Sequence, residues 1–308
     1  MEIYAPSYCQ NFKCIADKCK HSCCIDWEIN IDEKTYEKYK SENSAFAKEI
    51  LKNTKKTKSG AHFLLDKNGR CKNLDCRGLC KIITELGEDY LCDICRLHPR
   101  FFNYVGDRTE MGLGLSCEEA VRLALTDGER FTIVKIGENE EESFPEDFDA
   151  LTARDGIISF FENIDGACNE KIKATAEKYG ISTEFYTASE WIDYLLALEI
   201  LDEEWRTLLE SSKIKEQKTT PSSIGPYVEN LFKYLVFRHV STATSELSFV
   251  SRLAFSLLGV SLVIYLFERE EKMTESRLFE IVRLFSSEIE YSEENTESLL
   301  FELEINIM

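Results

Sequence analysis

Residues 9–27 read CQNFKCIADKCKHSCCIDW and place five cysteines within sixteen positions. Iron and zinc sites both need several thiolates that converge on one point, and short loops between cysteines supply them at a low cost in chain entropy. The stretch therefore predicts a metal site that organises a small domain around itself. The residues alone leave the metal open, because four thiolates around an iron–sulfur cluster and four around zinc look alike in sequence.

A second and more widely spaced set of cysteines follows. Cys92 and Cys95 are separated by two residues, a spacing at which a tight turn can hold one metal between both thiolates. The other members of this set would close the site from distant elements: Cys71, Cys76, Cys80 and Cys117. Plain burial is the competing interpretation, because cysteine is among the most buried residue types. Burial without metal binding stays an open interpretation for each of Cys9, Cys76, Cys92 and Cys168. His21 is an alternative metal ligand.

The distribution of the cysteines along the chain favours metal binding over ordinary burial. Of the twelve cysteines in 308 residues, only Cys168 follows position 117. The start of the chain shows no basic segment followed by an apolar run, so we expect a cytoplasmic protein whose thiols stay reduced rather than a disulfide framework. The longest uncharged apolar stretch, residues 253–267, is shorter than a membrane span requires, and we interpret it as a buried core helix.

Charge is uneven along the sequence. Residues 1–136 carry 22 Lys+Arg against 21 Asp+Glu, whereas the remainder carries 15 against 35. Binding to nucleic acid needs a basic face, so nucleic acid is not an expected partner, and no membrane partner is expected either. An acidic second half would attract a basic protein surface or a lysine side chain, although a solvated acidic helix face is the simpler interpretation.

The pattern of the chain predicts an α+β protein that is mostly α, with two domains. Residues 1–137 form a small cysteine-rich, metal-organised domain, and residues 148–308 form a helical bundle. The acidic segment 137–149, which contains Pro145 and has no periodicity, is the expected linker. Apolar residues recur at three- and four-residue spacing around Trp191, Leu231 and Leu278, as in amphipathic helices. No sequence repeat is expected.

Several short elements are predicted in the cysteine-rich part. Asp32 is typical of a helix N-cap, and Gly106-Asp107 fits the two-residue loop of a hairpin. The expected elements are strands at 26–31 and 61–65, a helix from Asp32 through Tyr39, hairpin strands at 100–105 and 108–113, and a helix that Ser116 and Glu119 open as a capping box and that continues to Leu125.

The motif Phe12-x-Cys14-x4-Cys19-x3-Cys23-Cys24, followed by Trp27, resembles the flagellin lysine-N-methylase family. The resemblance covers nearly the whole chain. It continues at Cys71-x8-Cys80 and at residues 85–87, 91–96, 99–100 and 115–120, then in the helical half at 229–230, 237–238, 288–290 and 292–295. The sequence departs from the family at Asp26, where its members commonly have glycine before the tryptophan.

This resemblance implies a bacterial protein-lysine N-methyltransferase that acts on flagellin. The methyl donor would be S-adenosylmethionine, and the protein would carry an iron–sulfur cluster, 4Fe-4S in type, with zinc as the alternative metal. The cysteines at family-like positions, and so the implied metal ligands, are Cys14, Cys19, Cys23, Cys24, Cys71, Cys80, Cys95 and Cys117. Methyl transfer to an amine does not itself require a metal, so a structural role of the cluster is the favoured interpretation, with redox sensing or a catalytic role as the alternatives.

The residues that bind the methyl donor are not evident, because no glycine-rich methyltransferase loop occurs. Polar residues in the family-like motifs are the candidates: Arg100, Asn103, Tyr104, Asn230 and Arg238. An internal hydrogen-bond network between helices explains the same residues equally well. The alternative function is a non-catalytic iron–sulfur or zinc protein for redox sensing or metal handling, which rests on the cysteines alone.

Overall fold

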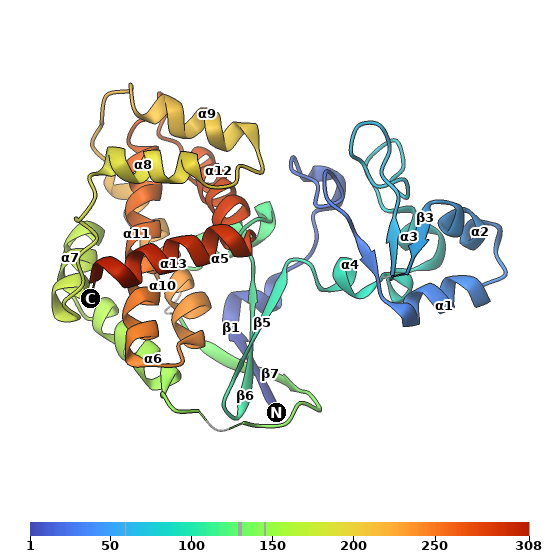
Figure 1. Ribbon diagram of the computed structural model, residues 1–308, viewed down its shortest axis with the longest axis horizontal. Helices are drawn as coiled ribbons and strands as arrows, with labels where there is room; N and C mark the ends of the chain where they lie inside the picture. The colour runs from blue at the N-terminus through green and yellow to red at the C-terminus, as the bar shows by residue number, and fades with distance from the viewer. Residues whose placement is uncertain (59, 129–130, 145, 308) are drawn as a thin grey trace. The chain divides into compact units, whose positions relative to one another are not determined.

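The computed structural model describes residues 1–58, 60–128, 131–144 and 146–307. As the sequence predicts, the chain is a mixed α+β protein with 55% helix and 13% strand, in which N-terminal sheets are followed by a helical region (Figure 1). It divides into two compact units. We call Lys13–Arg100 the cysteine unit, and Met1–Phe12 together with Phe101–Met308 the helical unit. The expected division at residues 137–148 therefore differs from the one observed.

Non-local strand pairing explains this difference. The helical unit contains a four-stranded sheet in the order β5-β6-β1-β7. Its first strand, β1 (Glu2–Pro6), runs parallel to β6 (Arg108–Leu113) and antiparallel to β7 (Ile133–Glu138). The chain start and residues 101–138 are thus joined to each other by backbone hydrogen bonds, and the cysteine unit is inserted between them in the sequence.

The predicted hairpin is confirmed with its boundaries. Strand β5 spans Arg100–Val105, and Gly106 takes a left-handed φ of 54° in the loop before β6. The predicted capping box is wrong, because helix α5 spans Glu118–Thr126 and its N-cap position is Cys117, which makes no side-chain capping bond. Glu119 pairs instead with Arg122 on the next turn.

Apolar packing holds the helices of the helical unit together. The predicted apolar stripes around Leu231 and Leu278 are confirmed, since both residues are buried. The stripe that begins at the buried Trp191 was predicted to reach Leu201, which is wrong at its end, because the helix ends at Ala197 and Leu201 is 54% exposed. The segment at 253–267 lies in α11, whose 22 residues are long and apolar enough to cross a membrane, although 67% of its most apolar window is buried against the rest of the protein. The helices are α6 (Ala150–Glu162), α7 (Cys168–Lys178), α8 (Ala188–Ala197), α9 (Glu203–Ser212), α10 (Gly225–His239), α11 (Glu246–Phe267), α12 (Glu275–Phe285) and α13 (Glu293–Ile307), with a π-helical turn at Ser286–Glu290.

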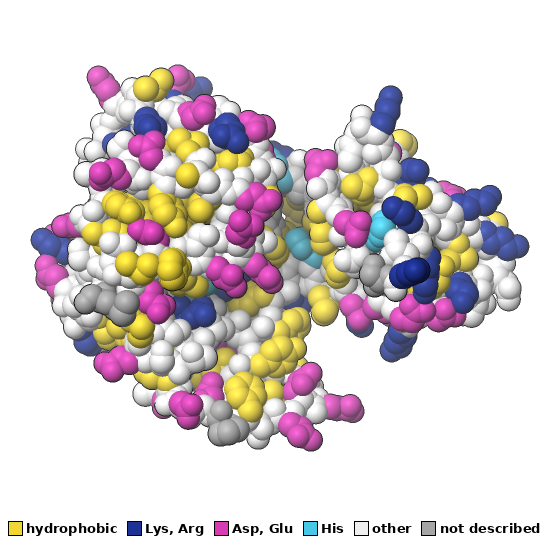
Figure 2. All heavy atoms as spheres, viewed as in Figure 1, with side chains coloured by type: hydrophobic (Ala, Val, Ile, Leu, Met, Phe, Trp, Pro, Cys, Tyr) yellow, Lys and Arg dark blue, Asp and Glu magenta, His cyan; other side chains and the backbone are white. Residues whose placement is uncertain are grey.

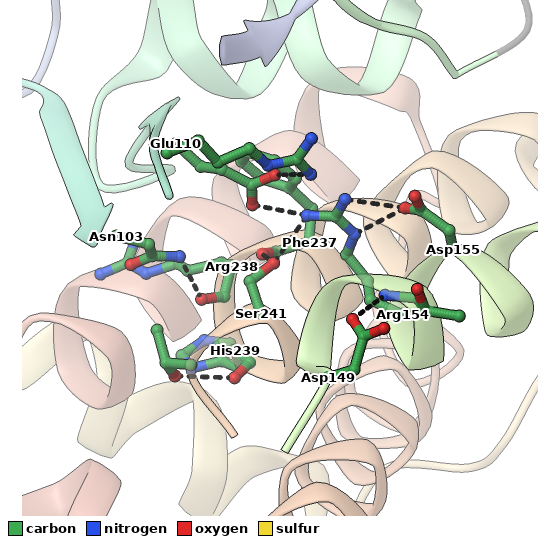
Figure 3. Close-up of polar contacts among 12 residues, drawn as sticks. Asn103, Glu110, Asp149, Arg154, Asp155, Phe237, Arg238, His239 and Ser241 are labelled. Carbon is green, nitrogen blue, oxygen red and sulfur yellow. Dashed lines mark hydrogen bonds and ion pairs between the residues drawn. The ribbon is translucent and has the colours of Figure 1, made fainter. Parts of the chain in front are cut away.

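Buried ion pairs fasten the sheet of the helical unit to its helices. Arg154 of α6 and Glu110 of β6 pair with both side chains fully buried, and Arg154 Nη1 also donates to Ser241 Oγ at 2.8 Å (Figure 3). Arg108 donates to the other oxygen of Glu110, and Asp155 accepts from Arg154. Every charge in this group therefore has a partner, which a buried ion requires.

The cysteine unit is smaller and is built from short elements. Its three-stranded sheet has the order β2-β4-β3, with β2 at Asn30–Ile31, β3 at Thr54–Thr57 and β4 at Gly60–Phe63. Strand β4 confirms the predicted strand near 61–65, whereas the strand predicted from Asp26 is wrong in its first four residues. Asp26 has a φ of 63°, which breaks an extended backbone. The helices are α1 (Glu33–Ser41), α2 (Ala45–Lys52), α3 (Lys81–Leu86) and α4 (Asp93–Leu97).

The two units differ in charge as well as in size. The cysteine unit carries 18 Lys+Arg against 14 Asp+Glu, and the helical unit carries 19 against 42. Figure 2 shows acidic side chains spread over the visible face of the helical unit. The helical unit is thus the acidic part of the protein.

Candidate metal centre

Two consecutive turns with the same sequence pattern place Cys71 and Cys80. Residues 65–71 read LDKNGRC and residues 74–80 read LDCRGLC, a repeat of the form L-D-x-x-G-x-C with a nine-residue offset. The sequence prediction of no repeat was wrong here. In the first turn Asp66 Oδ1 accepts from the amides two and four residues on, and in the second Asp75 Oδ1 does the same.

The backbone of the two turns is equally alike. Gly69 and Gly78 have φ values of 73° and 87°, and each donates its amide to the carbonyl of its turn's aspartate at 3.1 Å. Glycine adopts this left-handed conformation without steric cost, so the L-D-x-x-G-x-C pattern encodes the turn. Each turn closes with a bridge from its leucine to its cysteine. The repeat is therefore a structural device that delivers two cysteines in equivalent settings.

Backbone amides point at the sulfurs of these two cysteines. Burial raises the pKa of the Cys71 thiol, and the amide of Asn73 acts against burial by donating to the sulfur. Burial likewise raises the pKa of Cys80, whose sulfur accepts from the amides of Ile82 and Ile83. Hydrogen bonds of this kind favour the thiolate, which is the form that binds metal.

A second pair, Cys92 and Cys95, stands at the start of helix α4. Asp32 fixes the position of this helix, because its carboxylate accepts from the Thr35 amide of α1 at 2.8 Å and from the Asp93 amide of α4 at 2.9 Å. The predicted N-cap at Asp32 is thus confirmed, and the same side chain caps two helices. A hydrogen bond between the two thiols lowers the pKa of Cys92 and raises that of Cys95.

The third pair, Cys23 and Cys24, is tied to the first turn. The Cys71 amide donates to the Cys24 carbonyl at 2.9 Å, and the Asp26 amide donates to the Gly69 carbonyl at 2.9 Å. The hydrogen bond from Cys24 lowers the pKa of Cys23 to about 4, and a further hydrogen bond from His98 acts in the same direction. The pKa of Cys24 is raised by the same contact.

Six thiols are close enough for their charges to act on one another. The pKa of Cys71 is raised in part by Cys80 and Cys92, that of Cys24 by Cys71 and Cys80, and that of Cys95 by Cys24 and Cys80. We call this group the cysteine cluster: Cys23, Cys24, Cys71, Cys80, Cys92 and Cys95. It contains five of the eight implied metal ligands.

Cys92 is the member that the family-based ligand set omitted. It is fully buried in the core of the cysteine unit, beside the buried phenol of Tyr39. Its two-residue spacing from Cys95 was the signal that could have placed it in the set. Cys92 therefore combines the two-residue spacing of a metal-binding pair with burial in the core, because cysteine side chains form part of the core of this unit.

The remaining cysteines lie elsewhere. Cys14 and Cys19 belong to the first loop of the cysteine unit, where Cys14 Sγ accepts from the Ala16 amide at 3.4 Å and Cys19 Sγ donates to the His21 carbonyl at 3.2 Å. Cys117 belongs to the helical unit. Cys76 is exposed on the second turn and lines a pocket of about 420 Å³ with Cys71, while Cys9 and Cys168 are buried in the helical unit.

Two observations test whether the cysteine cluster fits a metal group. Within the described ranges, no three His, Cys, Asp or Glu side chains are arranged to hold a single metal ion. Zinc would need its four sulfurs only about 3.8 Å apart, since Zn–S bonds of about 2.3 Å point to the corners of a tetrahedron. An iron–sulfur cluster is larger and separates its thiolates further. Asn73 Nδ2 is also buried without any hydrogen-bond partner, and a thiolate or sulfide would accept from it. The thiols and this unpartnered amide are therefore compatible with a thiolate-bound metal group, and the identity of the metal belongs to the proposal below.

Two of the five candidate donor-binding residues, Asn103 and Asn230, make side-chain hydrogen bonds to the backbone within the helical unit. Asn230 Nδ2 donates to the carbonyls of Leu125 and Asp127 at 2.9 and 2.8 Å. Asn103 Nδ2 donates to the Arg238 carbonyl at 2.9 Å, as Figure 3 shows. Tyr104 is 51% exposed, and Arg100 belongs to the cysteine unit. For Asn103 and Asn230 these contacts belong to an internal hydrogen-bond network, and binding of the methyl donor by the five candidates stays a prediction.

The family-like motifs of the helical half supply buried polar groups. Burial alone raises the pKa of Glu290, but Arg238 and a 2.8 Å contact with His239 lower it overall. Burial raises the pKa of Glu288 to about 7, and one of its oxygens accepts from the Leu201 amide at 2.9 Å. Both glutamates lie in the π-helical turn, a rare element often found at functional sites.

Comparison of the chain with protein-family models, curated proteins and solved structures finds no match. The assignment of function therefore rests on the cysteine cluster and on the sequence motifs.

Proposed function

We propose that the cysteine unit binds an iron–sulfur cluster of the 4Fe-4S type. The observation that carries this proposal is the gathering of six thiols, from three separate segments, around turns whose backbone amides point at the sulfurs. Cys71 and Cys80 are two of the four ligands, and each thiol pair supplies one more. We assign Cys24 and Cys95 as the ligands from the two pairs, because both interact with Cys80 and both match the family motif.

We further propose that the protein is a flagellin lysine N-methyltransferase that uses S-adenosylmethionine in the bacterial cytoplasm. The motif resemblance supports this activity. Asp26 adds to it, because a φ of 63° is typical of glycine, the residue that family members commonly have there. The acidic helical unit would attract the lysine-bearing surface of a protein substrate.

Methyl transfer to an amine needs a neutral lysine that approaches the methyl group in line with the leaving sulfur. An acidic surface gathers lysines but does not deprotonate them, so a base or a desolvated pocket must do so. The cluster, when bound, holds the short elements of the cysteine unit together. None of its chemistry is required in the transfer step.

Calorimetry with S-adenosylmethionine, combined with the mass of a cognate flagellin after incubation, tests this activity. The full chain, purified without oxygen, is expected to bind the donor and to add methyl groups to flagellin. Cys168→Ser serves as the matched control, because Cys168 lies outside the cysteine cluster and should leave both results unchanged. A cluster-loaded protein that binds no donor and leaves flagellin's mass unaltered would refute the methyltransferase.

A non-catalytic redox sensor is the second candidate function. It is favoured by the two thiol pairs in hydrogen-bond contact, Cys23 with Cys24 and Cys92 with Cys95, because paired thiols can oxidise together when a cluster is lost. This function predicts a reversible redox transition and no binding of S-adenosylmethionine. The same calorimetric experiment therefore separates the two candidates.

A further inference from the structure

Asn73 is a buried polar residue directly beside the candidate metal centre. It lies between the two turns, two residues after Cys71, and is only 1% exposed. Its backbone amide and its side-chain amide both lie beside the Cys71 sulfur. In the part of the chain that the structure describes, Nδ2 is buried and has no hydrogen-bond partner.

Asn53 determines which way the side-chain amide of Asn73 points. Asn53 Nδ2 donates to Asn73 Oδ1 at 3.2 Å, so the oxygen of Asn73 is occupied and its NH2 group is the end left without a partner. Asn53 is itself fixed by its backbone, which donates to the Glu49 carbonyl at 3.0 Å and accepts from the Leu64 amide at 2.7 Å. The orientation of Asn73 is therefore built into the fold before any metal binds.

A buried amide without a strong acceptor costs free energy, and an anionic sulfur is the acceptor that this position offers. Hydrogen bonds to the sulfurs of an iron–sulfur cluster stabilise the reduced state more than the oxidised state, because the reduced state carries more negative charge. We propose that Asn73, oriented by Asn53, is a positioning residue that donates a hydrogen bond to the cluster through the Cys71 sulfur and raises its reduction potential. This inference rests on the proposed iron–sulfur function.

The test compares three variants of the full chain, all purified without oxygen. Iron and sulfide are measured first, and the midpoint potential is then measured by a redox titration followed in the visible spectrum. Asn73→Leu is expected to keep the iron and sulfide of the wild type and to shift the midpoint to a more negative value. Asn53→Ala is expected to shift it less in the same direction. Asn43→Ala, an exposed asparagine in the same unit, is the control and should not shift it.

Each outcome supports or refutes the iron–sulfur function, the role of Asn73, or both. If Asn73→Leu keeps its cluster and has the wild-type midpoint, the inference is refuted and the iron–sulfur function stands. If the wild type contains neither iron nor sulfide, the proposed function fails and the inference fails with it. If Asn73→Leu cannot hold a cluster, Asn53→Ala decides: a more negative midpoint supports the inference, and a midpoint equal to that of Asn43→Ala refutes it.

Discussion

The helical unit and the cysteine unit are stabilised in different ways. The core of the helical unit is a large apolar cluster that includes Trp205, Phe232 and Phe285. The core of the cysteine unit has only nine buried residues, and two of them, Cys71 and Cys92, are cysteines. Small domains bury too little apolar surface to be stable alone and commonly depend on a metal. From this difference we expect the cysteine unit to depend on a bound metal group to fold and the helical unit to fold without one.

Removal of the cluster is the strongest way to test this difference. Cys71→Ser combined with Cys80→Ser should abolish metal binding and unfold the cysteine unit, because the free energy of metal binding is also folding free energy. Limited proteolysis with mass spectrometry should then show cleavage throughout residues 13–100 and a protected helical unit.

Cys76→Ser is the matched control for this double variant, since Cys76 is exposed on the same turn as Cys80. It should keep both the metal and the proteolytic protection. Equal loss in the control would mean that the turn itself, rather than its ligands, is what the unit depends on.

The reverse test destabilises the helical unit and leaves the metal site of the cysteine unit unchanged. Glu110→Ala removes the buried partner of Arg154 and leaves Arg154 paired with the 60% exposed Asp155, so it should destabilise this unit by about 3 kcal/mol, the lower end of the usual cost of breaking a buried ion pair. Chemical denaturation followed by circular dichroism measures the loss. Asp155→Ala removes a partner that is 60% exposed and should cost no more than about 1 kcal/mol. Cluster absorbance that fell in Glu110→Ala in the native buffer would contradict the independence of the units.

The pH dependence of stability should also separate the two units. Burial raises the folded-state pKa of Glu288 to about 7, above the value of about 4.3 in an unfolded chain. The folded state therefore holds this proton more tightly, and the helical unit should lose on the order of 2 kcal/mol as pH rises from about 4 to 7. Glu288→Gln should flatten this dependence, and the exposed Glu297→Gln should not. Denaturation curves across this pH range that are identical for wild type and Glu288→Gln would refute the assignment.

The smallest expected effect concerns Asp32, which caps two helices of the cysteine unit. Asp32→Ala should cost about 1–2 kcal/mol and loosen the start of α4, where Cys92 and Cys95 stand. Hydrogen exchange should increase at the first turns of both α1 and α4. Asp149→Ala, which removes the cap of α6 alone, should increase exchange only at that helix. An unchanged α4 in Asp32→Ala would mean that the cluster rather than the cap positions the thiol pair.

The parts of the fold that local chemistry determines were predictable from the sequence. The hairpin around Gly106, the cap at Asp32 and the apolar stripes of the helical half all follow from residues close together in the chain. The parallel pairing of β1 with β6 was not predictable, because nothing in residues 2–6 specifies a partner about a hundred positions away. The boundary between the units depends on that pairing.

The candidate site was predictable only in part. The cysteine spacing pointed to all six members of the cysteine cluster, although the family-based ligand set left out Cys92, and Asn73 was missed. The repeat of L-D-x-x-G-x-C was visible in the sequence and would have shown that Cys71 and Cys80 are equivalent. The role of Asn73 was not visible, because it depends on the contact that Asn53 makes with its side-chain oxygen in the folded protein.

The visible absorption spectrum of the full chain purified without oxygen, combined with iron and inorganic sulfide analysis, tests the central claim most directly. We expect absorption from sulfur-to-iron charge transfer, with iron and sulfide in equal amounts. The Cys71→Ser, Cys80→Ser double variant should lose both the absorption and the metal. A colourless, folded protein with stoichiometric zinc, or with no metal at all, would contradict it.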